Sequence, residues 1–331
     1  MRFSLVLLCG ALALTGCKKD DAASGDDTAP DAAGSGSGSG SDMGQDPNAA
    51  FYVRSTDMTL QPGDEVTKCF YFHTSNTTMK PISKWVAHMS PGSHHMIMYF
   101  PQNGQNAGAD GTIDEACNNN IPIWIFASQQ QDLTLQFPTD DGNGQPLAQE
   151  VPANQAAYFQ MHYINTTDQP MTVHVELNAY ATTATTYTKT SPFVTYQFNI
   201  SIPPDAVGTT VTQSCTPPAG VKFWEMSTHA HKQAVHTEVF DGSTSLFASD
   251  DWEHPGDKEW NANPFYTFSG KLTWTCIYNN NDPNDPNHTT TVSQGQSAAT
   301  QEMCMATAYT FPSPKTSACV CQGASCTNIT L

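Results

Sequence analysis

The segment AYFQMHYI, residues 157–164, is the clearest of a series of strand-like stretches that decide the fold of this chain. Aromatic and other apolar residues of this kind favour a half-buried pleated surface. No stretch keeps the i, i+3, i+4, i+7 apolar pattern of an amphipathic helix together with helix caps. The segment therefore predicts a strand in an all-β protein.

Further segments of the same character run through the chain, separated by turn dipeptides such as Pro62-Gly63 and Asp241-Gly242. They include Lys68–Thr74, His95–Phe100, Met171–Tyr180, Phe193–Ile202, Val235–Phe240, Lys271–Tyr278 and Cys304–Phe311. Many short strands at this spacing are typical of antiparallel sandwiches and jelly rolls. For 331 residues, a prior of roughly 150 residues per domain predicts two tandem β-sandwich domains, at 49–195 and 196–331. The break is expected near Ser191-Pro192 or at Ser201–Pro204.

The composition limits the partners of the protein. The sequence is 38% apolar, enough for a sizeable core, and only 13% charged, with a formal net charge of −18. An acidic surface without a basic stripe repels phosphate backbones, so nucleic-acid binding is not expected. We expect a monomer whose acidic surface keeps it soluble.

The N-terminus indicates export. An apolar run, Leu5–Leu14, follows Arg2, and Leu14-Thr15-Gly16-Cys17 is similar to a bacterial lipobox, with Cys17 as the lipidated residue that ends a signal peptide at 1–17. Ordinary signal-peptide cleavage and a membrane-spanning anchor are the alternatives. Lys18 and Lys19 end the apolar run too early for a spanning helix.

A polar segment separates this anchor from the globular part. Residues 18–48 are rich in Gly, Ser, Ala and Asp, a composition that cannot bury a core and predicts a disordered tether. The expected location is the bacterial cell envelope, with the protein held by lipid on the outer membrane or cell surface.

Eight cysteines follow the anchor: Cys69, Cys117, Cys215, Cys276, Cys304, Cys319, Cys321 and Cys326. An even number beyond an export signal implies a set of disulfide bonds formed in an oxidising compartment. Zinc binding is the competing interpretation, above all for Cys319-Val320-Cys321. It is weaker, because the cysteines lack the paired two-residue spacing of zinc ligands.

Two pairs of histidines suggest a metal site. In His229-Ala230-His231, residues i and i+2 of a strand point to the same face, so both imidazoles can bind one ion. His94 and His95 face opposite ways in a regular strand, and they share an ion only at an irregular strand start, which Pro91-Gly92-Ser93 supplies. His73, His88, His236, His254 and His288 lack a partner at chelating spacing and are interpreted as ordinary polar residues, although a short loop could bring His88 near His94.

Two single residues extend this set. His162 lies in the segment 157–164, where a lone histidine is more often a core residue than a ligand. Met303 stands between Glu302 and Cys304, and its thioether is a soft ligand that selects Cu(I). Core packing is the ordinary role of a methionine. Met305 would share the face of Met303, so spacing alone leaves the choice between them open.

In their order along the chain, these residues resemble the copper type II, ascorbate-dependent monooxygenases, the family that includes peptidylglycine α-hydroxylating monooxygenase and dopamine β-monooxygenase. The similar motifs are His94-His95-Met96, His162-Tyr163, His229-x-His231, Cys276-x-Tyr278-Asn279 and Glu302-Met303-Cys304, within about residues 50–315. The resemblance implies tandem jelly-roll sandwiches, as in the catalytic core of that family and in peptide N-glycosidase F.

The resemblance also implies two dissimilar copper ions per chain. His94, His95 and His162 match an all-histidine copper that holds and relays an electron. His229, His231 and Met303 match the catalytic copper, where O2 binds and the substrate is hydroxylated. Three imidazoles support both oxidation states of copper, whereas a thioether stabilises Cu(I). The expected enzyme hydroxylates an aliphatic C–H bond with O2 and a one-electron donor such as ascorbate.

The family pattern further implies disulfides between Cys69 and Cys117 and between Cys276 and Cys304. The second of these would fix the strand that presents Met303. Cys215 is expected to pair with one of the C-terminal cysteines Cys319, Cys321 and Cys326. That crowded trio departs from the family, so the last two bridges stay open.

A second departure concerns the substrate. Peptide-amidating members have an Arg two residues before the HxH pair, and an Asn and a Tyr after the ligand Met, whereas this chain has Ser227, Met305 and Thr307. A buried carboxylate without an Arg partner is costly. The substrate is therefore expected to be an unknown organic compound, neutral or aromatic, and not a glycine-extended peptide.

Two other functions stay open at this point. A non-catalytic lipoprotein that binds, stores or delivers copper at the cell surface would keep every ligand and lose only the substrate pocket. A jelly-roll adhesion module would need neither ligand set.

Overall fold

The segment 157–164 forms a central strand, as its apolar composition predicts. In the computed structural model, which describes residues 42–102, 108–115 and 122–331, it belongs to β10 (Ala156–Ile164) and is buried along most of its length. The sheet has the order β6-β3-β10-β5-β7. Its other strands are β3 (Glu65–His73), β5 (Ser93–Phe100), β6 (Ile113–Asp114) and β7 (Ile123–Ser128).

A second sheet completes the first half of the chain. Its order is β1-β12-β4-β9-β13, with β8 paired to β4. Its strands are β1 (Phe51–Arg54), β4 (Lys80–Met89), β8 (Asp132–Gln136), β9 (Leu147–Val151), β12 (Val175–Ala181) and β13 (Thr188–Lys189). A short pair, β2 (Met58–Leu60) and β11 (Met171–Val173), lies apart from both sheets.

The second half again contains two main sheets. One has the order β20-β17-β23-β14-β24-β25, and the other β16-β21-β18-β19. The first comprises β14 (Ser191–Gln197), β17 (Lys222–Ala230), β20 (Lys258–Glu259), β23 (Cys304–Phe311), β24 (Ser317–Gln322) and β25 (Ser325–Thr330). The second comprises β16 (Thr209–Cys215), β18 (Ala234–Asp241), β19 (Thr244–Ser249) and β21 (Leu272–Tyr278), and the pair β15 (Ser201–Ile202) and β22 (Val292–Ser293) stands apart.

Three clusters of buried apolar side chains pack these sheets together. One consists mainly of first-half residues and one of second-half residues. The third joins the halves, since it combines Tyr99, Trp124 and Tyr158 with Val194 and Met305. Burial of one such aliphatic side chain contributes roughly 1.5–3 kcal/mol. The third cluster therefore fixes strands of the second half against the first.

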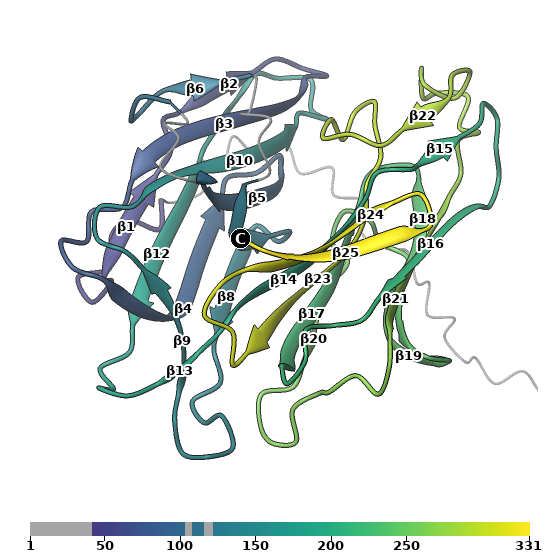
Figure 1. Cartoon of the computed structure of the whole chain (residues 1–331). Helices are drawn as coiled ribbons and strands as arrows, with labels where there is room; N and C mark the ends of the chain where they lie inside the picture. Colours follow the sequence, from purple (N-terminus) through teal and green to yellow (C-terminus); the bar gives the residue numbers. More distant parts are fainter. Residues whose placement is uncertain (1–41, 103–107, 116–121) are drawn as a thin grey trace, which may run out of the picture. The chain divides into compact units, whose positions relative to one another are not determined.

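The fold class predicted from the sequence is confirmed: the protein is all-β and consists of packed, mainly antiparallel sheets (Figure 1). Two pairings are parallel, β13 with β9 and β14 with β24. The last strand of the first-half sheets, β13, ends at Lys189, and the first strand of the second-half sheets, β14, begins at Ser191. The chain therefore passes from one set of sheets to the other at the expected break Ser191-Pro192, and not at the predicted domain boundary between residues 195 and 196. All described residues belong to one compact unit, so the division into two domains stays a prediction.

The predicted tether differs from the structure at its C-terminal end. The backbone N–H of Gly44 donates to Glu176 of β12, and that of Asp46 donates to Asn178 at 3.1 Å, so these residues are bound to the sheet. Cys17, the signal peptide and residues 18–41 lie outside the described residues. Among the described residues, no helix has the length and apolar composition needed to cross a membrane.

Candidate metal centre

A β-bulge at the start of β5 turns His94 and His95 toward one site. On β10, His162 pairs with His95 and the next residue pairs with Ser93, so His94 is an extra residue in β5. Such a bulge re-aims a side chain that would otherwise face the opposite side of the sheet. Gly92 makes the bulge possible: it has φ of 83°, and a Cβ there would lie 2.9 Å from a backbone oxygen. The irregular strand start predicted from Pro91-Gly92-Ser93 is confirmed.

The three histidines of the first predicted site lie together. One ring nitrogen from each of His94, His95 and His162 lies within 4.8 Å of the others, and all three residues are buried. The Nδ1 atoms of His94 and His95 are 3.0 Å apart. The buried Nδ1 of His162 has no hydrogen-bond partner within the described part of the chain, while its Nε2 lies 3.1 Å from the carboxylate of Glu65. Glu65 thus orients His162 so that its Nδ1 is free to bind an ion.

The second predicted pair is oriented by two glutamine residues. His229 Nδ1 lies 2.8 Å from Gln129 Oε1, and His231 Nδ1 lies 2.8 Å from the carbonyl oxygen of Gln301. The amide of Gln129 is itself fixed, because its Nε2 donates to the carbonyl of Thr228. Since both partners are acceptors, the proton is assigned to Nδ1 of each imidazole. This tautomer leaves the Nε2 lone pairs of both histidines for a metal ion.

Met303 lies beside this pair through strand register. His229 pairs with Met305 and Ala230 pairs with Cys304. His231 and Met303 are the next residues along these two antiparallel segments. Side chains at alternate positions share a face, so Met303 and Met305 both lie on the face of the HxH pair. The geometry supports Met303 as a candidate and, as the sequence did, leaves Met305 beside it. Met303 stays a predicted ligand.

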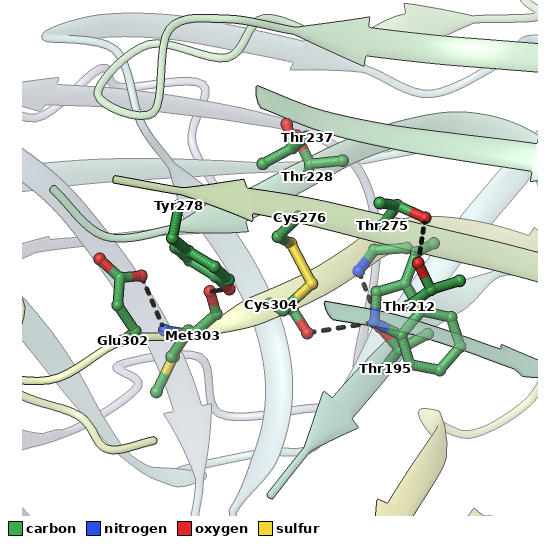
Figure 2. The surroundings of a disulfide bond; sticks show 12 residues. Thr195, Thr212, Thr228, Thr237, Thr275, Cys276, Tyr278, Glu302, Met303 and Cys304 are labelled. Carbon is green, nitrogen blue, oxygen red and sulfur yellow. Dashed lines mark hydrogen bonds between the residues drawn. A yellow bond between two sulfur atoms is a disulfide. The ribbon is translucent and has the colours of Figure 1, made fainter. Parts of the chain in front are cut away.

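Three contacts hold the Met303 segment in place (Figure 2). The disulfide Cys276–Cys304 adjoins Met303, and the Tyr278 hydroxyl donates to the Met303 carbonyl at 2.7 Å. The fully buried Glu302 side chain accepts the backbone N–H groups of His231 and Met303. Burial raises the pKa of Glu302 to about 8, although these hydrogen bonds favour its carboxylate. Glu302 therefore links the two chain segments that carry the second ligand set.

The two predicted ligand sets lie next to each other in the structure. The ring centroids of His95 and His229 are 5.1 Å apart, close to the 5.2 Å between His95 and His162. Burial lowers the pKa of His94 to about 2 and that of His231 to about 4, and it holds those of His95 and His229 well below the ordinary value. These imidazoles are neutral at neutral pH, which is the form that binds a metal ion.

The donor set fits copper. Neutral imidazoles suit copper and zinc alike, and the buried ring nitrogens of His94 and His162 that lack a hydrogen-bond partner within the described chain are where ligands are expected. A thioether selects Cu(I) over zinc. Met303 is therefore the residue on which the choice of copper depends.

A pocket opens beside His95 and His229. Its lining includes Trp124, Tyr309 and Glu225, and it contains no Lys or Arg side chain. Glu225 is only 8% exposed, and burial, reinforced by the charges of Asp257 and Glu259, raises its pKa well above the ordinary value. The pocket thus combines aromatic surface with acidic groups next to the candidate metal ligands.

The predicted disulfides of the described core are formed in part. Cys276 and Cys304 are bonded, as the family pattern implies. Cys69 is also disulfide-bonded, while Cys117 lies outside the described residues, so their pairing stays a prediction.

The C-terminal cysteines differ from the expectation. Cys321 and Cys326 face each other across β24 and β25 and are bonded. Cys215 and Cys319 are buried thiols in contact with each other, without a covalent bond. The expected disulfide of Cys215 with one of the trio is not formed in this structure: Cys321 and Cys326 are joined to each other, and Cys319, the remaining member, is the cysteine that Cys215 contacts.

Comparisons with known proteins leave the family open. No protein-family model matches the chain, and no curated protein matches it. The major capsid protein P2 of bacteriophage PM2 has a TM-score of 0.26 and 7% identity, over 78% of this chain and 97% of that one. The PBSX exported protein XepA has a TM-score of 0.22 and 8% identity, over 78% and 86%. These similarities are too weak to support an argument.

Gln129 gives a direct test of the orientation of His229. We expect Gln129→Ala to weaken copper binding at the second site by ~10–100-fold, because outer hydrogen-bond partners of metal-bound histidines have effects of this size. Isothermal titration of each variant with copper measures the change. The neighbouring pocket residue Gln130, whose side chain makes no hydrogen bond within the described chain, provides the control Gln130→Ala. Equal affinities of the two variants would contradict the role given to Gln129.

Proposed function

We propose that this protein is a copper-dependent monooxygenase that hydroxylates an aliphatic C–H bond with O2 and a one-electron donor such as ascorbate. One observation carries the proposal. Histidines more than a hundred positions apart, in the His94 and His229 motifs, come together in one buried cluster of neutral imidazoles beside a pocket. A buried polar cluster without a bound ion is costly to maintain, so a binding role explains it better than packing does.

In this proposal the residues of the site have three roles: they bind copper, orient the ligands and hold the substrate. Bound copper supplies one-electron redox chemistry and activation of O2. His94, His95 and His162 would hold one ion, and His229, His231 and Met303 the other. Glu65, Gln129 and Gln301 fix the ring orientations through hydrogen bonds. Trp124 and Tyr309 would hold an organic substrate in the pocket next to His229 and exclude water from it.

The pocket supports a substrate without a carboxylate. Ser227, which stands where the resemblance would require Arg, lines the pocket and donates its hydroxyl hydrogen to the Gly256 carbonyl. Glu225 and Asp257 line the same pocket, and no Lys or Arg among its lining residues could pair with a substrate carboxylate. The copper-loaded protein should therefore give no amidated product from glycine-extended peptides in a mass-spectrometric assay. Robust amidation of such a peptide would contradict this view of the pocket.

Ascorbate-dependent O2 consumption by the copper-loaded protein tests the proposed activity. We expect two copper ions per chain and O2 uptake that rises when the substrate is present in a compound screen. His162→Ala should lose one ion and the uptake together. Binding of fewer than two ions by the unaltered chain would contradict the site assignment.

The second candidate function is copper storage or delivery at the cell surface. The same ligands support it, and the weak similarity to known proteins gives no separate evidence for catalysis. Two bound ions without O2 uptake across a broad substrate screen would favour storage over the monooxygenase.

The lipid anchor is proposed from the sequence alone. Cys17→Ser should move the protein from the membrane fraction to the soluble fraction of the cell envelope, because acyl chains contribute ~0.8 kcal/mol for each buried CH2 group. Immunoblotting of separated fractions measures this. Retention of the variant in the membrane fraction would contradict anchoring at Cys17.

A further inference from the structure

A loop of the second half reaches the first histidine set. It connects β19 with β20 and comprises residues 250–257. Its Trp252 ring is stacked on His94, with centroids 4.6 Å apart and an interplanar angle of 28°. The ring centroid of His254, a histidine without a predicted role, lies 6.5 Å from that of His94. The contact therefore joins a candidate ligand of the first half to a side chain of the second.

The loop has a defined conformation of its own. The carboxylate of Asp251 accepts the backbone N–H groups of Glu253 and His254 at 2.9 and 2.8 Å. Asp250 lies 2.6 Å from His236 on β18. Trp252 also packs against the core of the second half. The position of the indole is thus fixed by packing within the second half of the chain as well as by its contact with His94.

The orientation of His94 depends on this stack. His162, His229 and His231 each have a hydrogen-bond partner on the ring nitrogen that faces away from the proposed metal. His94 has no such partner within the described part of the chain: its Nδ1 lies 3.0 Å from His95 Nδ1, and its buried Nε2 makes no hydrogen bond. An aromatic face can take the place of that hydrogen bond. It also attracts the positive charge that an imidazole acquires when it binds a metal cation.

We propose that Trp252 is a positioning residue for the first metal site and that it holds His94 in the ligating orientation from the second half of the chain. The proposal rests on the copper site of the proposed function and does not depend on hydroxylation. The same loop reaches the pocket through Gly256 and Asp257. The loop that carries Trp252 therefore contacts both the first ligand set and the pocket.

Cu(I) titration of the full chain against a chromophoric chelator tests the proposal. Trp252→Ala should weaken binding of one of the two copper ions by ~10–100-fold, as loss of an orienting partner does, and leave the other unchanged. Trp252→Phe keeps an aromatic face and should restore most of that affinity. His94→Ala combined with Trp252→Ala should be no weaker at the first site than His94→Ala alone, because the indole acts through His94.

Fluorescence provides a second readout. Cu²⁺ bound next to a stacked indole should quench its emission, so part of the copper-induced quenching should disappear in Trp252→Phe. Trp260, whose ring lies tilted against that of Tyr266 with centroids 5.0 Å apart, gives the matched control Trp260→Phe, in which the quenching should persist.

The outcomes separate this proposal from the proposed function. Two-site binding that is unchanged in Trp252→Ala would overturn the role of Trp252 and leave the copper site intact. Equal weakening at both sites, with a lower melting temperature of the metal-free variant, would assign Trp252 to general packing and also overturn it. Failure of the unaltered chain to bind copper would contradict the proposed function and this inference together.

Discussion

Replacing Met303 with Ile should abolish turnover while the first site still binds one copper ion. Ile keeps the volume and apolar character of the side chain but removes the sulfur, so it tests the ligand and not the packing. Loss of the proposed thioether should reduce O2 consumption by at least ~100-fold, above the effect of losing an outer-shell partner. Ascorbate-dependent O2 uptake and copper content, measured on the same preparation, give both quantities.

Met305 offers the matched control for this experiment. It lies on the same face of β23, pairs with His229 and is almost fully buried. If Met303 is the ligand, Met305→Ile should lower stability modestly and keep both copper ions and most of the activity. The opposite result, with full activity in Met303→Ile and loss in Met305→Ile, would move the ligand by two residues. Full activity in both variants would remove the thioether from the site.

Replacing Glu225 with Gln should stabilise the metal-free protein at neutral pH. Burial raises the pKa of Glu225 well above its ordinary value of 4.5, with the charge of Asp257 as the next cause. The folded state therefore keeps a proton that the unfolded state releases above pH 4.5, so stability contributed by this group is lost as pH rises. The free-energy cost of this group in the folded state therefore grows as pH rises above 4.5. Gln does not titrate, so the variant should escape this cost.

The pH dependence distinguishes this explanation from a change in packing. The difference in unfolding free energy between Glu225→Gln and the unaltered chain should be near zero at pH 4.5 and grow toward pH 7. Urea unfolding at several pH values measures it. The exposed Asp168, which is not among the charges that raise the pKa of Glu225, gives the control Asp168→Asn, which should change stability little. A difference that does not vary with pH would show that Glu225 is not held protonated.

Strands were the part of the fold that the sequence predicted well. The expected segments at 157–164, 271–278 and 304–311 correspond to β10, β21 and β23 with ends within one residue. The segment 171–180 was expected as one strand, but the structure divides it at His174. There the Ser90 hydroxyl accepts the backbone N–H of His174 and donates to its carbonyl, replacing a strand partner. A contact from a residue so distant in sequence leaves no local pattern to recognise.

The candidate site could be predicted only where a short sequence motif determines the local direction of its side chains. The spacing in His229-Ala230-His231 placed two imidazoles on one face, and Pro91-Gly92-Ser93 indicated the irregular start that turns His94 and His95 together. Gln129, Gln301 and Trp252, which orient the histidine rings, belong to no motif. Each acts through one contact across the fold, and single Gln or Trp residues in loops carry no signal of such a role.

The sequence by itself determined the all-β fold, the segments that form its central strands and the residue types able to bind a soft metal ion. These follow from alternation, turn residues and ligand chemistry, which act over a few positions. Only the tertiary structure decided that the two histidine sets lie 5.1 Å apart, measured between the rings of His95 and His229. It also decided that a loop of the second half covers His94. Such contacts depend on how the two halves pack, and packing is set by the complementarity of whole buried surfaces.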